Sequence, residues 1–388
     1  MGDKMQYIFW SIVFIFLWMY ILYPLFLIGL SKIKKNRQVK EDIIENDNDL
    51  PRVSMIICAH NEEKVIEDKI RNLLKSDYPK DKLEIIIASD NSTDNTNEIV
   101  KRYSNKGIIL YEAQERKGRA NVQNEAFKTS KGDIIAFSDA NSMWDEKALR
   151  ILVSNFKNKS VAYVTGKLVY VNDVENVTSY SESLYWKFDL LLRKLESKIH
   201  SITAGNGAIY AVKREYFREI DILYSHDFEF PNLMVSLGKR SIFDERAKVF
   251  EKAGENTNDE FNRKVRMFSR AWHKIINHFN IFSPFKMGLT YSLFMISHRL
   301  FRYASGLLHF ILLVMNIFLA KQNIYLMLLV PHLFIYLLAI VGHVTNSKRK
   351  IVYIPYYYFV FQYATFLGFF KAITGNVKPF WQKAESTR

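Results

Sequence analysis

The 388-residue sequence has a single cysteine, Cys58, and it has neither an internal repeat nor a low-complexity tract. One cysteine excludes an intrachain disulfide and any metal site built from several cysteines. Because Cys58 lies within an apolar segment, we expect it to be a small buried hydrophobic residue and not a reactive thiol. The length exceeds that of a usual single domain, so two or more structural units are expected.

The sequence also lacks a stripe of basic residues interleaved with aromatic ones, although its formal net charge is +14. A positive charge of this size suits either nucleic acid or the anionic face of a membrane as a partner. Because the basic residues are scattered through the middle of the chain, the sequence argues against nucleic-acid binding. Long apolar runs near both ends favour membrane lipid as the partner.

The first apolar run, residues 7–30, is about as long as a membrane-spanning helix, which needs roughly 20 residues. A cleaved signal peptide would have a shorter apolar core of about 7–15 residues, followed by a cleavage site of small residues. A basic cluster follows instead and outnumbers Lys4 on the other side, and its members are Lys32, Lys34, Lys35 and Arg37. We therefore expect an N-terminal transmembrane anchor over residues 1–37, a polar linker over residues 38–50, and a cytoplasmic chain beyond them.

Three further apolar runs stand near the other end, at residues 303–320, 325–341 and 351–373. They predict about three C-terminal membrane helices within residues 303–388. The basic residues that precede the third run belong on the cytoplasmic side, in agreement with a cytoplasmic middle domain. The third run leaves an alternative open, because a full span would place the basic C-terminal tail outside, against the positive-inside trend.

The segment before these runs, residues 283–302, mixes apolar residues with charged ones. His298, Arg299 and Arg302 interrupt its apolar pattern. We therefore expect this segment to lie at the membrane interface and not to cross the bilayer.

Between the membrane segments, residues 51–282 alternate between strand-like and helix-like patterns. Nearly continuous apolar runs, typical of strands buried on both faces, occur at residues 53–58, 83–88, 108–111, 133–138 and 161–171. Helical patterns follow Asn61 and Asp94, which can cap helices, and also cover residues 119–129 and 178–198. Strands and helices joined by short polar turns predict an α/β domain with a mostly parallel central sheet.

Polar clusters stand directly after several of these strands, at residues 60–62, 90–94 and 139–141. Ligands of parallel α/β sheets bind beyond the carboxyl ends of the strands. Because all three clusters fall at such ends, the sequence predicts one ligand site at this edge of the sheet.

Asp139 and Asn141 follow the fourth predicted strand two positions apart, so both side chains can leave the turn on the same side. They supply one charged and one neutral oxygen, and Mg²⁺ or Mn²⁺ takes oxygen ligands together with waters and substrate phosphates. The pair is therefore a candidate metal site. Taken alone, an Asp-x-Asn sequence is more often a turn at the end of a strand.

Two further groups suit a phosphate-bearing substrate and a proton transfer. Lys117, Gly118 and Arg119 open a predicted helix, where cationic side chains and free N–H groups fit a diphosphate, although basic residues at helix starts are common. Asp227 precedes an aromatic, apolar segment, and a carboxylate at a pocket edge can act as a general base. Taken alone, Asp227 is more simply read as a surface carboxylate.

Together these motifs resemble glycosyltransferase family 2, and in particular its membrane-integrated branch of hyaluronan, cellulose and poly-N-acetylglucosamine synthases. The matching segments are A-H-N-E-E, S-D-N-S-T-D, K-G-R-A-N, D-A-N, A-G-N-G-A and H-D-F-E-F-P, which begin at residues 59, 89, 117, 139, 204 and 226. The resemblance covers roughly residues 53–270 and extends to the membrane arrangement, with one helix before the catalytic domain and several after it. It implies the fold of a nucleotide-diphospho-sugar transferase, which is GT-A-like.

The resemblance also implies an inverting transfer from a nucleotide sugar, with a UDP-sugar as the expected donor. The residues that match the family's nucleotide-sugar site are Ala59, His60, Glu62, Asp90, Lys117, Arg119 and Asp139. Those that match its acceptor site are Ala204, Gly205, Asn206, Gly207, Arg263 and Arg266. Asp227 matches the catalytic base, and Asp139 with Asn141 matches the site of a Mg²⁺ or Mn²⁺ ion. The metal and Lys117 or Arg119 would stabilise the departing diphosphate.

The chain departs from the family pattern at three places. Asn141 stands where a second aspartate is usual, so metal binding would depend more on Asp139 and on the diphosphate. His226 precedes the expected base where a glutamate or aspartate is common, and we expect it to have a packing role. The Gln-x-x-Arg-Trp motif of processive members is reduced to Arg266 in residues 263–267, which places processivity or the usual acceptor in doubt.

The leading hypothesis is a multi-pass enzyme of the plasma membrane that builds a polysaccharide or extends a lipid-linked saccharide with its catalytic domain in the cytoplasm. An alternative is a transferase that adds one sugar to a polyprenyl-phosphate lipid. A third is a transporter with a regulatory nucleotide-binding domain. The third is disfavoured because the apolar runs after Tyr303 contain no acidic residue that would mark an ion path.

Overall fold

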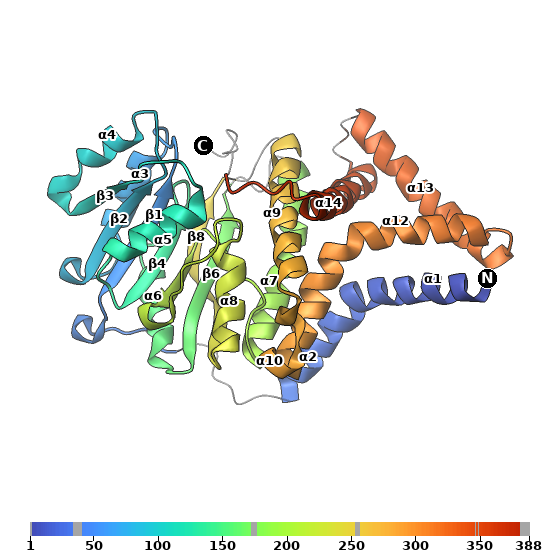
Figure 1. Cartoon of the computed structure of the whole chain (residues 1–388), viewed down its shortest axis with the longest axis horizontal. Coiled ribbons are helices and arrows are strands. Elements are labelled where there is room, and N and C mark those ends of the chain that lie inside the picture. Colours follow the sequence, from blue (N-terminus) through green and yellow to red (C-terminus); the bar gives the residue numbers. More distant parts are fainter. Residues whose placement is uncertain are drawn as a thin grey trace.

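The protein was analysed as a computed structural model, which describes residues 2–33, 41–171, 177–252, 257–345, 347 and 349–380. Figure 1 shows a sheet covered by helices at one end of the molecule and a group of long helices at the other. Several basic residues on which the predicted orientation depends lie outside the described residues, namely Lys34, Lys35, Arg37 and Lys348.

The sheet has eight strands in the order β3-β2-β1-β4-β7-β6-β8-β5. The strands are β1 (Val53–Ala59), β2 (Leu83–Ser89), β3 (Ile108–Glu112), β4 (Ile134–Asp139), β5 (Met143–Trp144), β6 (Val161–Tyr170), β7 (Tyr210–Lys213) and β8 (Arg240–Glu251). β1 to β4 run parallel, β6 pairs in parallel with β8, and β7 and β5 pair antiparallel with their neighbours. The predicted α/β fold with a mostly parallel sheet is confirmed.

Alternate side chains of β1 enter two hydrophobic cores, one on each face of the sheet. Met55 and Ile57 belong to one core, whereas Ile56 and Cys58 belong to the other. The helices on the first face are α3 (Ile66–Leu74), α4 (Thr96–Lys101) and α6 (Ala148–Ser154), and those on the second are α5 (Arg119–Thr129) and α8 (His226–Ser236). Burial raises the pKa of Cys58 to about 12, which agrees with the expected inert thiol.

The five predicted strands and α5 lie close to their predicted bounds, whereas β5, β7 and β8 were not predicted. The prediction that Asn61 caps the following helix is wrong. Asn61 has a φ of 55°, and α3 begins only after Val65, whose side chain makes no capping hydrogen bond. The Asn61 Oδ1 instead accepts the N–H of Thr93 at 2.8 Å, which joins the turn after β1 to the turn after β2. Asp94 does support its helix, because its Oδ1 accepts the N–H of Thr96 at 3.0 Å.

Three helical segments among the described residues are long and apolar enough to cross a membrane, namely Asp3–Ile33, Leu289–Leu319 and Asn323–Thr345. The first comprises α1 (Gly2–Leu17), a π-helical turn (Trp18–Leu22) and α2 (Tyr23–Ile33). The second comprises α11 (Leu289–Phe294), a π-helical turn (Met295–Leu300) and α12 (Phe301–Leu319), and the third is α13. The first two segments bend at their π-helical turns (Figure 1), where the Trp18 indole N–H donates to the Ser297 hydroxyl at 2.9 Å.

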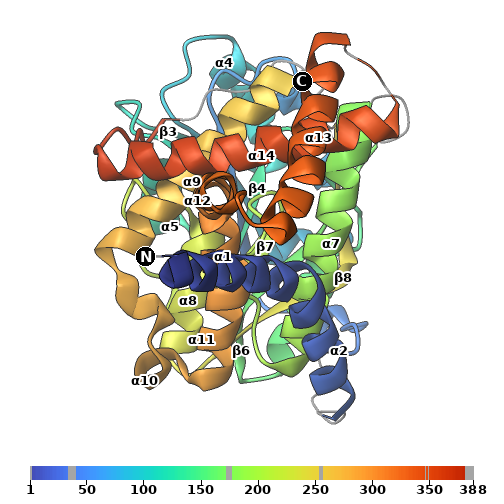
Figure 2. The same ribbon diagram turned by 90° about the vertical axis from the view of Figure 1, so that its right-hand side faces the viewer.

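The third C-terminal apolar run forms α14 (Lys350–Ile373), which is not among the candidate membrane spans of the described residues. Two C-terminal candidate spans are therefore present in place of the expected three or so. α14 packs against α9 (Thr257–Asn277), where Phe268 and Phe361 meet edge to face at 5.2 Å between ring centroids. Figure 2 shows α14 running across the molecule, whereas α12 points toward the viewer.

The segment predicted to lie at the interface, residues 283–302, falls partly within this second candidate span. Its residues from Leu289 onward continue into α12 without a break in the helix. Length and composition alone do not define depth in a bilayer, so the predicted boundaries of the membrane segments stay predictions.

Candidate active site

The polar clusters predicted to share one site do lie at one edge of the sheet. In the strand register, Ala59 at the end of β1 is level with Ser89 on β2, and Cys58 is level with Asp139 on β4. The parallel strands therefore bring the residues after β1, β2 and β4 together at their carboxyl ends.

The turns after β1 and β2 are held together by backbone contacts. The N–H of Asp90 donates to the carbonyl of Ala59 at 2.8 Å, and Nδ1 of His60 lies 2.9 Å from the carbonyl of Asp90. The N–H of Glu62 donates to the Thr96 hydroxyl at 2.8 Å. Burial lowers the pKa of His60, so its imidazole is neutral at physiological pH.

The Asp90 carboxylate connects the end of β2 to the loop before α5. Its oxygens accept the N–H of Lys117 at 3.0 Å and the N–H of Gly118 at 3.0 Å. Burial raises the pKa of Asp90 in spite of these two hydrogen bonds. The Lys117 side chain points to the surface, where its ammonium lies 3.1 Å from the Glu115 carboxylate.

Arg119 links the two predicted halves of the site. Its guanidinium lies 2.8 Å from the Asp139 carboxylate and donates to the carbonyl of Gly207 at 2.6 Å. Burial disfavours the guanidinium charge, but the carboxylates of Asp139 and Asp227 and other nearby groups together outweigh this effect and raise the pKa of Arg119. Arg119 therefore lies between a carboxylate of the predicted donor half and a loop of the predicted acceptor half.

Asp139 and Asn141 both remain partly accessible, and the Asp139 side chain is 30% exposed. Within the described residues, no group of three or more His, Cys, Asp or Glu side chains could hold a metal ion. Two oxygen donors nevertheless suit a Mg²⁺ or Mn²⁺ ion whose other ligands are waters and substrate phosphates. The donor set therefore fits the expected metal, with the diphosphate supplying part of the coordination.

The predicted acceptor segment, residues 204–207, is a loop that follows α7 (Val177–Ile199). The N–H of Gly205 donates to the carbonyl of Asp227 at 2.6 Å, and the N–H of Asn206 donates to the Thr165 hydroxyl at 3.1 Å. A Cβ atom on Gly205 would lie 1.9 Å from the Tyr163 hydroxyl, so the loop needs glycine there. Ala204 packs in the core that faces α9.

Asp227 lies half-buried in the first turn of α8, beside the acceptor loop. Its neighbour His226 is buried, and its Nδ1 lies 3.1 Å from the Tyr210 hydroxyl. Burial, with the nearby Arg119 charge, lowers the pKa of His226 to about 3. His226 is therefore a neutral core residue, which confirms the expected packing role.

The arginines of α9 differ in their surroundings. Arg263 is held by Glu260 on its own helix, at 2.7 and 2.8 Å, and its side chain is 46% exposed. Arg266 is half-buried, and burial together with the charges of Arg270, Arg263 and Arg119 lowers its pKa to about 10. Arg266 therefore forms a cationic group with Arg119 and Arg270, whereas Arg263 is paired with Glu260.

Sequence reasoning missed Arg270, which joins this cationic group. The electrostatic neighbours of Arg270 include Arg119 and Asp227. Arg270 stands one helical turn after Arg266, so the spacing along α9 was a signal that could have found it. Its guanidinium donates to the carbonyls of Lys378 at 3.1 Å and Pro379 at 2.5 Å.

The segment after α14 was not predicted to reach the site either, but it lies against the loop before α5. Gly118 has a φ of 95°, and a Cβ atom built on it would lie 2.4 Å from the carbonyl oxygen of Pro379. The Arg116 guanidinium lies over the Phe380 ring at 5.5 Å. No local pattern could reveal this contact, because more than half of the chain separates the two segments.

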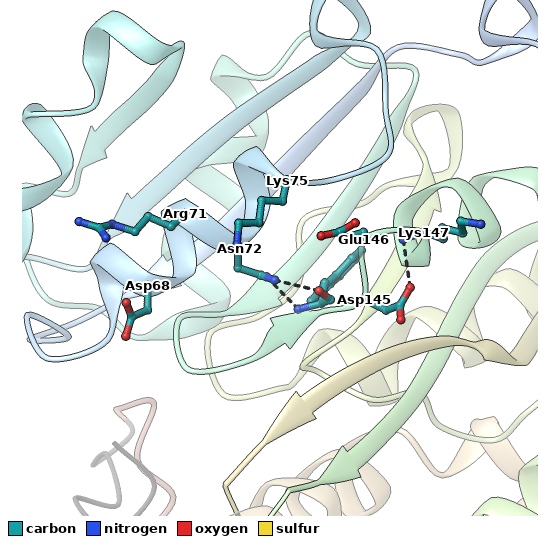
Figure 3. Close-up of a pocket in the computed structure, with 8 residues that line it drawn as sticks. Asp68, Arg71, Asn72, Lys75, Asp145, Glu146 and Lys147 are labelled. Carbon is teal, nitrogen blue, oxygen red and sulfur yellow. Dashed lines mark hydrogen bonds between the residues drawn. The ribbon is translucent and has the colours of Figure 1, made fainter.

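One surface pocket lies elsewhere and is lined by none of the predicted site residues. It has a volume of about 720 Å³ and is lined by residues of α3 and of the loop that follows β5. Figure 3 shows that the side chains of Asp68, Arg71 and Lys75 point in different directions, whereas Asn72 bonds to the backbone of Trp144. Because its charged side chains do not point toward a common centre, we assign no function to this pocket.

Comparison with known proteins identifies the domain that carries the site. Residues 54–220 match the family model described as glycosyl transferase family 2. The probable glycosyltransferase YdaM of Bacillus subtilis (strain 168) is 27% identical over 317 residues, which is 76% of this chain and 74% of that protein. The poly-beta-1,6-N-acetyl-D-glucosamine synthase of Staphylococcus aureus (strain COL) is 34% identical over 137 residues, which is 35% of this chain and 32% of that protein.

A solved structure shares the fold. The mannosyltransferase PcManGT from Pyrobaculum calidifontis, in complex with GDP-Man and Mn²⁺, matches with a TM-score of 0.70 and 19% identity over 94% of this chain and 99% of that one. At this identity the likeness shows the fold alone, and it confirms the predicted GT-A-like domain. Residues 54–220 therefore form a glycosyl transferase family 2 domain, and the protein is a glycosyltransferase.

Proposed function

We propose that the protein is a membrane-embedded, inverting glycosyltransferase that extends a polysaccharide or a lipid-linked saccharide at the cytoplasmic face of the plasma membrane. One chain of contacts carries the proposal. Arg119 joins Asp139 to the carbonyl of Gly207, and the N–H of Gly205 in the same loop holds the backbone of Asp227. The residues expected to bind donor and acceptor therefore share one set of contacts.

In the proposed reaction, the acceptor hydroxyl loses its proton to the Asp227 carboxylate as its oxygen attacks the anomeric carbon of the donor. The bond from that carbon to the diphosphate breaks, and the leaving group takes the electron pair. Arg119 and Arg266 supply positive charge where the diphosphate becomes more negative. A Mg²⁺ or Mn²⁺ ion, when bound at Asp139 and Asn141, would add Lewis-acid stabilisation of the same oxygens.

The proposed donor is a UDP-sugar. The relatives act on or bind different sugars, since one is named as a poly-N-acetylglucosamine synthase and the structural neighbour holds GDP-Man. We therefore suggest measuring nucleotide release from the purified protein with UDP-N-acetylglucosamine, other UDP-sugars and GDP-mannose. Release from GDP-mannose alone would replace the UDP-sugar in this proposal.

The first prediction concerns the base. We expect Asp227→Asn to keep nucleotide-sugar binding but to lower the transfer rate by about 10²–10⁴-fold, because only the proton acceptor is removed. Isothermal titration with donor and a transfer assay check the two parts separately. Asp221→Asn, at an exposed carboxylate in the segment before α8, serves as control. Turnover like that of the wild type in Asp227→Asn would sink the assignment.

The second prediction concerns the metal. We expect Asp139→Ala to lose the part of nucleotide binding that depends on Mn²⁺, because the only charged oxygen of the proposed ligand pair is removed. Nucleotide affinity with and without Mn²⁺ is the measurement, and Asp145→Ala in the unrelated pocket is the matched control. An unchanged response to Mn²⁺ in Asp139→Ala would show that the metal role is misassigned.

One observation supports the alternative that the enzyme adds a single sugar to a polyprenyl-phosphate lipid. Exposed Met267 stands where processive members carry the tryptophan expected to stack on the acceptor sugar, and Trp272 is buried in the core between α9 and α14. Sizing the product made without added lipid separates the two versions, because long chains exclude a single addition to polyprenyl phosphate.

A further inference from the structure

A network of buried charged side chains joins the membrane helices to the acceptor loop. It contains three arginines, two carboxylates and one histidine, all less than a tenth exposed, namely Asp189, Arg193, Glu196, His298, Arg299 and Arg302. The first three lie on one face of α7, and the others lie on the π-helical turn and first turn of α12. Ionic groups are costly to bury and need both charge partners and hydrogen bonds.

The membrane side of the network centres on Asp189. Its Oδ1 accepts from the Arg302 guanidinium at 2.7 Å and lies 3.1 Å from Nε2 of His298. Nδ1 of the same imidazole lies 2.8 Å from Glu196, which also accepts the Tyr23 hydroxyl of α2 at 2.8 Å. Both candidate spans that carry π-helical turns therefore bond to α7.

The catalytic side of the network centres on Arg193. Its Nε lies 2.5 Å from the other oxygen of Asp189, and its Nη1 donates to the carbonyl of Gly205 at 2.7 Å. Gly205 in turn donates its N–H to the carbonyl of Asp227 at 2.6 Å. A continuous path of polar contacts thus runs from His298 through Asp189, Arg193 and Gly205 to the backbone of Asp227.

A second path reaches the start of the same loop. Thr203 donates its hydroxyl proton to Glu196 at 3.2 Å and accepts from Nε of Arg299 at 2.8 Å. His298 and Arg302 also border an apolar cavity of about 170 Å³ between the membrane helices and α7. On the side that faces this cavity, the two side chains are therefore not held in place by close packing.

We propose that Arg193 is a positioning residue for the transfer step, and that Asp189 and His298 relay the position of the membrane helices to it. Arg193 fixes the position of the Gly205 carbonyl by its hydrogen bond. The loop that contains Gly205 in turn fixes the position of Asp227 relative to the acceptor. The inference rests on the proposed function, because it assumes that Asp227 is the base and that the loop borders the acceptor. A displacement of about 1 Å at such a site can cost about 10²-fold in rate.

The test uses the full-length protein in nanodiscs, with Arg193→Met and His298→Gln compared with His309→Gln. His309 lies on the same continuous helical segment but contacts His332 and aromatic rings, outside the network. We expect Arg193→Met to lower kcat of transfer by about 10–100-fold and His298→Gln by at least about fivefold. Donor affinity should change by less than about threefold in both, and His309→Gln should match the wild type.

Three outcomes would overturn the inference. They are wild-type kcat in Arg193→Met, donor affinity that falls in parallel with kcat, and identical behaviour of His298→Gln and His309→Gln. If Arg193→Met does not fold, His298→Gln still decides. It replaces the imidazole with a polar amide and leaves the arginines paired with their carboxylates. Asp227→Asn is measured beside them. If that variant stays active, the proposed base fails, whereas an inactive Asp227→Asn with a wild-type His298→Gln rejects only the relay.

Discussion

At the scale of single residues, the candidate site contains titratable side chains that burial keeps neutral, beside side chains that stay charged. His226 and Cys58 lie close to the site but are buried, and burial shifts the pKa of each toward the neutral form. Arg119 stays charged, as guanidinium groups do in proteins, and pairs with the carboxylate of Asp139 at 2.8 Å. Proximity to a site therefore does not by itself make a titratable residue part of the chemistry.

His226 allows a prediction about acid stability. Its pKa is about 3 in the native state and about 6.5 in an unfolded chain. Between about pH 3 and about pH 6.5, the imidazole is therefore protonated in the unfolded state but not in the native state. Stability is fully present above about pH 6.5 and falls as the pH drops toward 3, by up to about 1.4 kcal/mol per pH unit. We expect His226→Phe to flatten this slope.

Thermal unfolding of the detergent-solubilised protein between pH 7 and pH 4 measures the effect. The aromatic neighbours Phe137, Phe217 and Phe230 should accept the phenyl ring at neutral pH. His278→Gln, at an exposed position, is the comparison. Partial burial and the charges of Lys274 and Lys286 also lower the pKa of His278, so this variant should flatten the slope less than His226→Phe does. The same acid slope in His226→Phe would show that another group causes it.

At the scale of elements, the predicted acceptor loop, residues 204–207, is held from three sides. Arg193 of α7 bonds to Gly205, Asp227 of α8 accepts from it, and Thr165 of β6 accepts from Asn206. Because the loop contributes backbone groups to each contact, its conformation matters more than its side chains. The small residues of the segment are explained by this close approach of backbone to neighbouring elements.

Gly205 tests this view of the loop. We expect Gly205→Ala to lower the free energy of unfolding by about 1–3 kcal/mol and to lower transfer, because the added methyl group would overlap the Tyr163 hydroxyl. Adding Tyr163→Phe should recover part of both losses, since it removes the nearest atom. Gly29→Ala, where nothing lies within 4 Å, is the control for glycine replacement in general.

Denaturant unfolding and the transfer assay measure the two effects in the same preparations. Full activity and wild-type stability in Gly205→Ala would mean that the loop can move away from β6. The tight packing proposed for the loop would then be wrong.

At the scale of the whole molecule, the catalytic domain and the membrane helices are joined by α7, α9 and α14. α9 contributes arginines to the site and packs on α14, and α7 contributes the charged network that meets α12. Figure 1 places these helices between the sheet and the long apolar helices. The membrane helices are therefore connected to the site through packed and charged contacts, and not by a linker alone.

The proposed orientation can be tested with single cysteines, because the natural Cys58 is buried and should not react. We expect Arg349→Cys to be labelled by an impermeant maleimide only after the cells are opened, since basic residues favour the cytoplasmic side. Lys321→Cys, in the exposed turn between α12 and α13, should be labelled in intact cells. The reverse pattern would contradict a cytoplasmic catalytic domain.

The sequence by itself determined five of the eight strands, the edge of the sheet where polar clusters gather, and the family that their motifs resemble. These features depend on local periodicity and on motifs within a few residues, and parallel strands then bring the clusters together. Asn61 was misread as a cap because the sequence does not reveal that its backbone turns into the left-handed region to meet Thr93.

Only the tertiary structure decided the contacts between distant segments. Arg193 and Gly205, Arg270 and Pro379, and Asp189 and His298 meet because helices from separate parts of the chain pack together. Their partners carry no periodic signal, since one charged residue in a helix has the same local pattern whether it faces water or a buried carboxylate. The gathering of polar clusters at one edge of the sheet was therefore predictable from the sequence, whereas the link from the apolar helices to the proposed base was not.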